Sequence, residues 1–446
     1  MSKPRIEPRV LKGFRDYLPQ LAIPRTQMIR TLQEVFAAFG FSPIDTPALE
    51  YTEILLGKGS DETDKQLFRF SDQGGRDVAM RFDLTVPLAR FVAMHINELG
   101  VPFRRYHIAP VWRAEKPQRG RYREFIQCDF DIIGTRSTIA DAEIVSLIHS
   151  ALDTLKIGHR IRLNNRLVLN GLLSGLGREG SSAPVLRAID KLEKLGEEVV
   201  RQELRTEAGL SDGDIDRVFS FLKLSSAQLS NRDLLAELKG FFGANEIAAT
   251  GLQELESVLT VAADSGLGDE VVTIDLSIAR GLDYYTGSVF ETTLTDLPEI
   301  GSICSGGRYN DLAGLYTKQE LPGVGASIGL DRILAALEEL KRTTNKSTTA
   351  SVFVALLDEG TAGTCLKIAN QLRQSGIATE LALDYARLGN QLKYASKKGV
   401  EFVVIAGRGE LDSGVCSVKN IIAGEQEDGV PIASLSEYLR NRIQSS

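Results

Sequence analysis

The sequence predicts a mixed α/β protein whose main domain is of the α+β kind, with an antiparallel sheet, flanking helices and a helical insertion. A small α/β domain is expected to follow it. Strand patterns at residues 106–113 and 124–133 flank a basic loop, strand signals vanish between residues 170 and 261, and strands alternate with helices from residue 351 onward. Segregated strands and helices indicate an α+β fold, whereas alternation indicates a largely parallel sheet.

The composition is that of an ordinary globular chain. With 446 residues it is too long for one core, so two or three domains are expected. The first residues lack the apolar stretch of a signal peptide, and no apolar run approaches the roughly 20 residues that span a bilayer. The four cysteines form no Cys-x-x-Cys pair and the four histidines lack metal-ligand spacing, so we expect a cytoplasmic protein without a protein-held metal.

The N-terminal region begins with a predicted helix over Pro24–Phe39, because its apolar residues recur at helical spacing and Gly40 suits a helix end. A short strand, Phe41–Thr46, is expected next. Residues Gln66–Phe70 and Val78–Phe82 are typical of paired strands around a glycine-containing turn. This order places a sheet element directly before the first polar motif.

Asp83 and Thr85 form that motif, between the paired strands and a predicted helix over Pro87–Glu98. Short polar side chains at this place cap the free amides of a helix. A carboxylate and a hydroxyl at a strand end are equally suited to hold an ammonium group. The spacing leaves both interpretations open.

The basic loop between the central strands carries the strongest functional signal. Its cations fall within eleven residues of a chain whose net charge is -7, and only Glu115 opposes them: Arg113, Lys116, Arg119, Arg121 and Arg123. Such a cluster forms a local anion site on an acidic protein. In the returning strand Phe125, Gln127, Asp129 and Asp131 share one face, because side chains repeat every second residue. A solvated hairpin with a basic tip is the alternative. The pattern favours a nucleotide pocket beside a site for a small polar substrate.

The remaining elements define the domain limits. Residues 1–169 and 262–342 form the expected main domain, 170–261 the helical insertion, 343–350 a polar linker and 351–446 the α/β domain. The predicted helices are Thr138–Leu155, Ala188–Arg205, Gly213–Leu222, Leu234–Phe241, Gly360–Ser375, Leu388–Lys398 and Ile432–Arg442. The further predicted strands are Ile161–Leu163, Val271–Leu276, Ser351–Leu357, Ala378–Leu383 and Glu401–Ala406.

Five segments together resemble the class II aminoacyl-tRNA synthetases, and specifically the histidyl-tRNA synthetase family. Pro24–Pro47, Trp112–Phe125 and Gly323–Arg332 are similar to the three class motifs. Arg280–Tyr285 and Ser305–Tyr309 resemble the two segments specific to the histidine enzymes. The resemblance covers nearly the whole chain. It implies a class II antiparallel sheet and a C-terminal anticodon-binding domain.

The resemblance also implies a set of site residues. The catalytic residues are Arg113 and Arg280, which approach the α-phosphate of ATP from two sides. The residues implied for histidine are Asp83, Thr85 and Gln127 at its α-amino group and Asp131, Tyr285 and Tyr309 at its imidazole. Those implied for ATP are Arg113, Glu115, Arg121, Tyr122, Phe125 and Arg332, with the adenine between Phe125 and Arg332.

The implied reaction joins L-histidine to tRNA(His) through histidyl-adenylate, with ATP as a substrate and Mg²⁺ as its counterion. The resemblance further implies a homodimer and no membrane association. Four cations of the last domain are expected to contact tRNA: Arg387, Lys393, Lys397 and Lys398. One alternative is a histidine sensor that resembles the synthetase, the regulatory subunit of ATP phosphoribosyltransferase. A second is another class II synthetase, such as a prolyl or threonyl enzyme.

Overall fold

The structure is a computed structural model that describes residues 6–57, 66–118, 120–178, 182–225, 229–279, 285–343 and 346–444. Its contacts divide the chain into two compact units. The larger comprises Met1–Arg15 and Met28–Leu340, and the smaller comprises Asp16–Gln27 and Lys341–Ser446.

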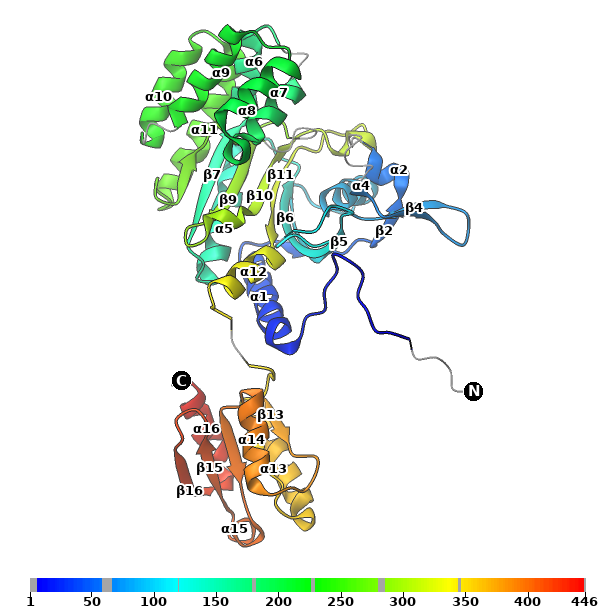
Figure 1. The fold of residues 1–446 in the computed structure, drawn as a ribbon, viewed down its shortest axis with the longest axis vertical. Coiled ribbons are helices and arrows are strands. Elements are labelled where there is room, and N and C mark those ends of the chain that lie inside the picture. Colours follow the sequence, from blue (N-terminus) through cyan, green and yellow to red (C-terminus); the bar gives the residue numbers. More distant parts are fainter. Residues whose placement is uncertain are drawn as a thin grey trace. The chain divides into compact units, whose positions relative to one another are not determined.

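An eight-stranded sheet is the centre of the larger unit (Figure 1). Its strands, in spatial order, are β1 (Ser42–Pro43), β5 (Phe103–Trp112), β6 (Glu124–Ile133), β11 (Gly323–Gly329), β10 (Ser302–Tyr309), β9 (Ser288–Leu294), β7 (His159–Asn165) and β8 (Val272–Ile274). The central pairs from β5 to β7 are antiparallel, as predicted, whereas the outer pairs β1 with β5 and β7 with β8 are parallel. The sheet is therefore mixed at its edges.

One face of this sheet is apolar and covered by helices. Phe130 and Ile132 of β6 are buried there beside α1 (Pro19–Ala38) and α5 (Thr138–Thr154). The ring centroid of Phe36 in α1 lies 5.0 Å from that of Phe130. Because side chains alternate along β6, the residues between these core positions point to the opposite face. That opposite face carries the polar residues of the site.

The first strands after α1 are shorter or shifted relative to the prediction. The predicted strand over residues 41–46 is only β1, which pairs with β5 through two residues. The predicted pair is present as β3 (Arg69–Ser71) and β4 (Asp77–Met80). These join β2 (Leu49–Tyr51), which was not predicted, in a three-stranded sheet. Among the described residues, two helices accompany them: α2 (Thr52–Leu56) and α4 (Thr85–His95).

The predicted helical insertion follows β7 and precedes β8 along the chain. Figure 1 shows its helices grouped together in green. Its helices are α6 (Arg166–Gly175), α7 (Ser182–Asp190), α8 (Leu192–Thr206), α9 (Asp212–Ser225), α10 (Asn231–Phe242) and α11 (Glu246–Asp264). Helices α6 and α11 approach closely at two glycines, since a Cβ at Gly171 would lie 2.6 Å from that of Ala248 and one at Gly251 would lie 2.8 Å from the nitrogen of Val168. The apolar residues of these helices continue the core of the sheet.

After β11 the chain enters α12 (Leu330–Glu339). The short turns of 3₁₀ helix in this unit are η2 (Pro298–Ile300) and η3 (Ala313–Leu315). No helix in the described part of the chain is both long and apolar enough to cross a membrane.

The smaller unit is an α/β domain, as predicted, but its five-stranded sheet is mixed and not largely parallel, because β15 and β16 add two antiparallel pairs. Its strands, in spatial order, are β13 (Thr379–Leu381), β12 (Val352–Val354), β14 (Phe402–Ile405), β15 (Val415–Asn420) and β16 (Gln426–Pro431). Its helical segments are η4 (Glu359–Thr361), α13 (Ala362–Gln374), α14 (Leu388–Lys398), α15 (Arg408–Asp412), η5 (Ile432–Ser434) and α16 (Leu435–Gln444). The β15–β16 hairpin was not predicted, because β16 is a polar edge strand with one buried residue.

Candidate functional site

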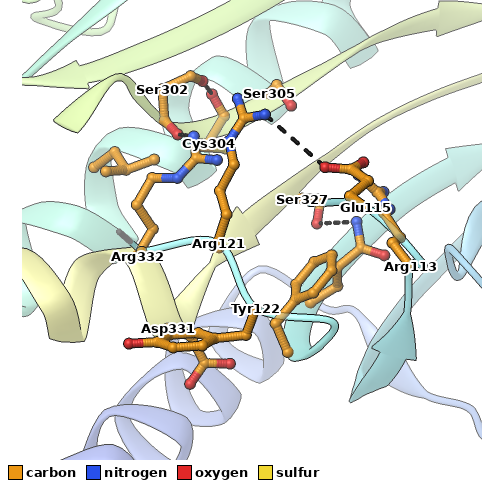
Figure 2. Close-up of a pocket in the computed structure, with 15 residues that line it drawn as sticks. Arg113, Glu115, Arg121, Tyr122, Ser302, Cys304, Ser305, Ser327, Asp331 and Arg332 are labelled. Atoms are coloured by element: carbon orange, nitrogen blue, oxygen red, sulfur yellow. Dashed lines mark hydrogen bonds and ion pairs between the residues drawn. The ribbon is translucent and has the colours of Figure 1, made fainter. Parts of the chain in front are cut away.

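A cavity on the polar face of the large sheet brings together residues from three strands, one helix and one loop (Figure 2). The described residues that line it are Arg113, Glu115, Gly120, Arg121, Tyr122, Phe125, Gln127, Ser302, Ile303, Cys304, Ser305, Ser327, Gly329, Asp331 and Arg332. They come from the β5–β6 loop, from β6, β10 and β11, and from the first turn of α12. All six residues implied for the nucleotide are among them.

Three arginines place cationic groups around this cavity. Arg113 donates from Nε to the carbonyl of Phe82 at 2.9 Å, and its guanidinium carbon lies 5.2 Å from the ring centroid of Phe125. Arg332 donates to the carbonyl of Ser302. Figure 2 shows Arg121 extending toward Glu115, whose Oε2 is 4.0 Å from Nη1 of the arginine. The cavity therefore combines an aromatic ring with guanidinium groups, which suits a nucleotide with phosphates.

The N-terminal segment holds the loop that carries these residues. The carbonyl of Gly13 accepts from the Arg123 nitrogen at 2.8 Å, and Arg15 donates from Nη1 to the hydroxyl of Tyr122 at 2.7 Å. Gly13 has a φ of +89°, and a Cβ there would lie 2.8 Å from the side chains of Arg123 and Pro117. Arg15 was not predicted, because 107 residues separate it from Tyr122 and no local pattern marks the pair.

A buried polar cluster lies further along β6 on the same face. Tyr309 donates its hydroxyl to Oδ1 of Asp131, and Nη2 of Arg105 lies 2.6 Å from Oδ2. Gly325 lies directly across from Asp131 in β11, and a Cβ at this glycine would collide with the carboxylate. Glycine is thus required at 325 so that the Asp131 side chain has room. Two residues implied for the imidazole, Asp131 and Tyr309, are brought together here.

The other residues implied for the amino acid surround this cluster. Asp83 accepts from the backbone nitrogen of Val86 at 3.1 Å, and Thr85 is the first residue of α4. Gln127 donates to the hydroxyl of Ser327 at 3.1 Å. Tyr285 lies against Gly307, where a Cβ would be 2.9 Å from its ring. Arg280, the second residue implied to be catalytic, lies outside the described residues.

Burial controls the charges of this cluster. It raises the pKa of Asp83 to about 6, although the Val86 amide and the charges of Arg113 and Arg105 act in the opposite direction. It raises the pKa of Asp129 to about 7, and the neighbouring Asp131 adds to that rise while Arg105 opposes it. Burial also raises the pKa of Asp131, against Arg105 and the Tyr309 hydroxyl. At neutral pH a fraction of the Asp129 side chains therefore retains a proton that an unfolded chain would release.

Asp129→Asn is expected to flatten the pH dependence of stability. The pKa of Asp129 is raised from 3.8 to about 7, so between those values the folded chain keeps a proton that the unfolded chain has lost. The free energy of unfolding should therefore fall as pH rises through this window, by up to about 1.4 kcal/mol per pH unit, and the asparagine variant should lose that fall. Urea denaturation between pH 4.5 and 7.5 measures the difference.

Asp77→Asn serves as the matched control, because the expected change of stability with pH has the opposite sign. Arg69 lowers the pKa of Asp77, which is exposed, by donating hydrogen bonds to its carboxylate. The stabilisation due to Asp77 should thus be lost as pH falls, so Asp77→Asn should change stability least in acid. Parallel stability curves for the wild type and Asp129→Asn would contradict the assignment.

The described residues contain no group of three His, Cys, Asp or Glu side chains placed to hold a metal ion. Carboxylates in the cavity come from Glu115 and Asp331, and Asp331 accepts from the backbone nitrogen of Ile126 at 2.7 Å. A divalent cation with phosphates as its main ligands needs only one or two protein carboxylates. The cavity therefore suits a cation that arrives with a nucleotide.

Comparison with known proteins identifies relatives of this chain. Residues 13–333 match the family described as histidyl-tRNA synthetase, and residues 351–442 match the anticodon binding domain. The histidine–tRNA ligase of Rhodopirellula baltica is 54% identical over 424 residues, which cover 95% of each chain. The crystal structure of histidyl-tRNA synthetase from Nostoc sp. PCC 7120 superposes with a TM-score of 0.89 at 35% identity, covering 98% of this chain and 100% of that one.

A structure related to the predicted alternative is also similar. It is described as an ATP phosphoribosyltransferase regulatory subunit/histidyl-tRNA synthetase from Bacillus halodurans C, with a TM-score of 0.74 at 25% identity over 88% of this chain and 97% of that one. Both its TM-score and its identity are lower than those of the Nostoc enzyme.

Proposed function

The chain belongs to the histidyl-tRNA synthetase family, and we propose that its site activates L-histidine with ATP and transfers the histidine to tRNA(His). The observation that carries this proposal is the position of two sites on one face of β6. The cation-lined cavity lies at Phe125 and Gln127, and the buried polar cluster lies at Asp129 and Asp131. Alternate residues of a strand lie next to one another on the same face. ATP bound at the first site and histidine bound at the second would therefore be close enough to react.

The first step needs no nucleophile from the protein. The carboxylate of histidine attacks the α-phosphorus of ATP, a bond forms to that phosphorus, and pyrophosphate leaves to give histidyl-adenylate. Catalysis then consists of positioning the reactants and stabilising the negative charge on the phosphate oxygens. We assign charge stabilisation to Arg113 and Arg280, and binding of the adenine to Phe125 and Arg332. Glu115, Arg121 and Tyr122 complete the nucleotide site.

The amino-acid side of the site selects the imidazole. Asp131 and Tyr309 already share a hydrogen bond, and Tyr285 lies beside them across Gly307. Asp83, Thr85 and Gln127 take the α-amino group. A pocket with polar groups that only one side chain can satisfy rejects analogues that lack the matching donor or acceptor. In the second step a terminal ribose hydroxyl of tRNA attacks the adenylate carbonyl, and AMP leaves.

Mg²⁺ fits the proposed reaction as a partner of the triphosphate. Glu115 is the cavity carboxylate that we assign to it, because Asp331 is engaged by the Ile126 amide. When bound, the cation supplies positive charge to the phosphate oxygens. Arg113 and Arg121 orient the same phosphates from the protein side.

We further propose the division of the chain and its assembly. Residues 1–169 and 262–342 form the catalytic domain, 170–261 the helical insertion domain, 343–350 the linker and 351–446 the anticodon-binding domain. The segment Pro24–Pro47 resembles class motif 1, which supports a homodimer. Separate apolar cores in residues 28–336 and 352–439 support the independent folding of the last domain.

Amino-acid-dependent pyrophosphate exchange with ATP tests the function. Among the twenty amino acids we expect exchange with histidine alone, because the polar groups around Asp131 match an imidazole. Exchange with proline or threonine instead would indicate another class II synthetase. Histidine binding without any exchange would indicate the sensor alternative.

A further inference from the structure

The structure contains a buried arginine, Arg105, that belongs to none of the roles assigned above. It lies on β5, directly across the strand pair from Asp131, and its side chain is 0% exposed. It is the largest fully buried side chain among the described residues. A guanidinium is almost never fully buried unless a partner group requires it.

The contacts of Arg105 converge on the amino-acid side of the site. Its Nη2 lies 2.6 Å from Oδ2 of Asp131, 3.9 Å from Oδ2 of Asp129 and 3.4 Å from the carbonyl of Leu84. Its Nε and Nη1 are also buried and make no hydrogen bond to any residue in the described part of the chain. The charge of Arg105 is therefore directed at two carboxylates, and Asp131 is much the closer.

Two buried carboxylates that share one guanidinium cannot both remain ionised easily. Desolvation favours the protonated form of each, and a nearby cation opposes this effect most strongly at short range. Arg105 therefore stabilises the carboxylate form of its closer partner, Asp131, more than that of Asp129. Asp129 is the partner that keeps a proton, which agrees with its pKa of about 7.

The ionisation of Asp131 decides which ligand group it accepts. One of its oxygens already accepts from Tyr309, and the other faces Arg105. A carboxylate has only acceptor sites, whereas a protonated acid also donates. The remaining lone pairs of Asp131 therefore require an N–H group from the ligand, which an imidazole provides.

We propose that Arg105 is a specificity-determining positioning residue, which holds Asp131 ionised so that the pocket accepts the N–H of the histidine imidazole. This inference rests on the proposed function, since it concerns the same amino-acid site. Arg105 acts through Asp131 and does not itself touch the reacting atoms. Without the guanidinium, Asp131 would be protonated over part of the working pH range and would bind imidazole poorly.

The groups around Asp131 and its neighbours limit what else titrates. Arg105, Asp129 and Tyr309 interact with Asp131 itself. His107, Asp83, Cys304 and Arg81 interact with Arg105 or Asp129, and Arg113 interacts with Asp83. Burial lowers the pKa of His107 to about 4 and raises the pKa values of Cys304 and Tyr309. Among these groups, Asp83 and Asp129 have pKa values of about 6 and about 7.

Arg105→Met tests the proposal in histidine-dependent pyrophosphate exchange. Loss of a close guanidinium raises the pKa of a carboxylate by about one to three units, so the KM for histidine should rise about ten- to hundredfold at pH 7. The KM for ATP should change by less than about threefold. The ratio of the variant's histidine KM to that of the wild type should fall as pH rises from 6 to 9. Free histidine titrates identically in the assays of the variant and of the wild type, so its titration cancels in this ratio. Any pH dependence that remains therefore comes from the protein.

Two further variants keep the test decisive. Arg104→Met replaces the neighbouring arginine, whose Nη2 pairs with Oε2 of Glu143 at 2.7 Å, and should leave the histidine KM ratio near one at every pH. Arg105→Met combined with Asp129→Asn removes the guanidinium together with the second buried carboxyl group, so that Asp129 no longer titrates beside Asp131. If Arg105→Met alone does not fold, this double variant carries the same expectation.

The outcomes separate the inference from the proposed function. Failure of the wild type to exchange with histidine would refute the function itself. A histidine KM ratio that does not depend on pH, or equal increases in the KM values for histidine and ATP, would show that Arg105 is only structural and would overturn the inference.

Discussion

Arg113→Ala is expected to lower the rate of histidine-dependent pyrophosphate exchange by about 10²- to 10³-fold, mainly in kcat. The guanidinium lies in the cavity, fixed by its bond to the Phe82 carbonyl and by the ring of Phe125. A preorganised cation at the α-phosphate stabilises charge that develops only in the transition state. Its loss should therefore reduce turnover more than it weakens ATP binding.

Arg104→Ala provides the matched control for this result. Arg104 is also an arginine, and it lies on β5. Its side chain points to the opposite face of the sheet and pairs with Glu143 of α5. Exchange by this variant should stay within about twofold of the wild type, since the loss of one half-exposed ion pair costs about 1 kcal/mol or less of stability. A kcat near wild type for Arg113→Ala, with the fold intact, would remove Arg113 from the proposed mechanism.

The fold was predictable where a local pattern was strong. The alternation of apolar and polar residues along β6 is enough to place Phe125, Gln127 and Asp131 on one face of the strand. In the insertion, apolar spacing predicted segments that correspond to α8, α9 and α10, whereas α6 and α11 were not among the predicted helices. The β2 strand and the β15–β16 hairpin were missed, because β2 has one buried residue and β16 is mostly exposed. Edge strands of this kind are stabilised by pairing, which sequence periodicity does not reveal.

The site was predictable only in part for a related reason. Residues on one strand share a face through spacing alone, but a partner on the next strand depends on register. Arg105 lies just outside the predicted strand that begins at Tyr106, so its position across from Asp131 could not be inferred from the pattern. The need for glycine at 325 also follows from this register, since only the paired strands show which side chain lies over it.

Deleting the residues after Thr349 is expected to reduce charging of tRNA(His) by roughly a hundredfold at limiting tRNA, while histidine-dependent exchange stays within about threefold of the wild type. All buried residues of the larger core lie between Met28 and Ala336, and the described residues of the cavity end at Arg332. The anticodon-binding domain has its own core. Loss of about 3 kcal/mol of tRNA binding would reduce charging at limiting tRNA by roughly a hundredfold. Both rates are measured on the same preparation.

A full-length variant distinguishes loss of the domain from loss of its surface charges. Arg387, Lys393 and Lys397 are exposed at and along α14, whereas Lys398 lies 3.0 Å from Glu380 and 5.0 Å from the centre of the Tyr394 ring. Replacing the three exposed cations by alanine should weaken charging less than the deletion does, with a shallower dependence on salt. Equal loss of exchange and charging in the deletion would instead mean that the domain is needed for the structure of the catalytic site, because exchange requires no tRNA.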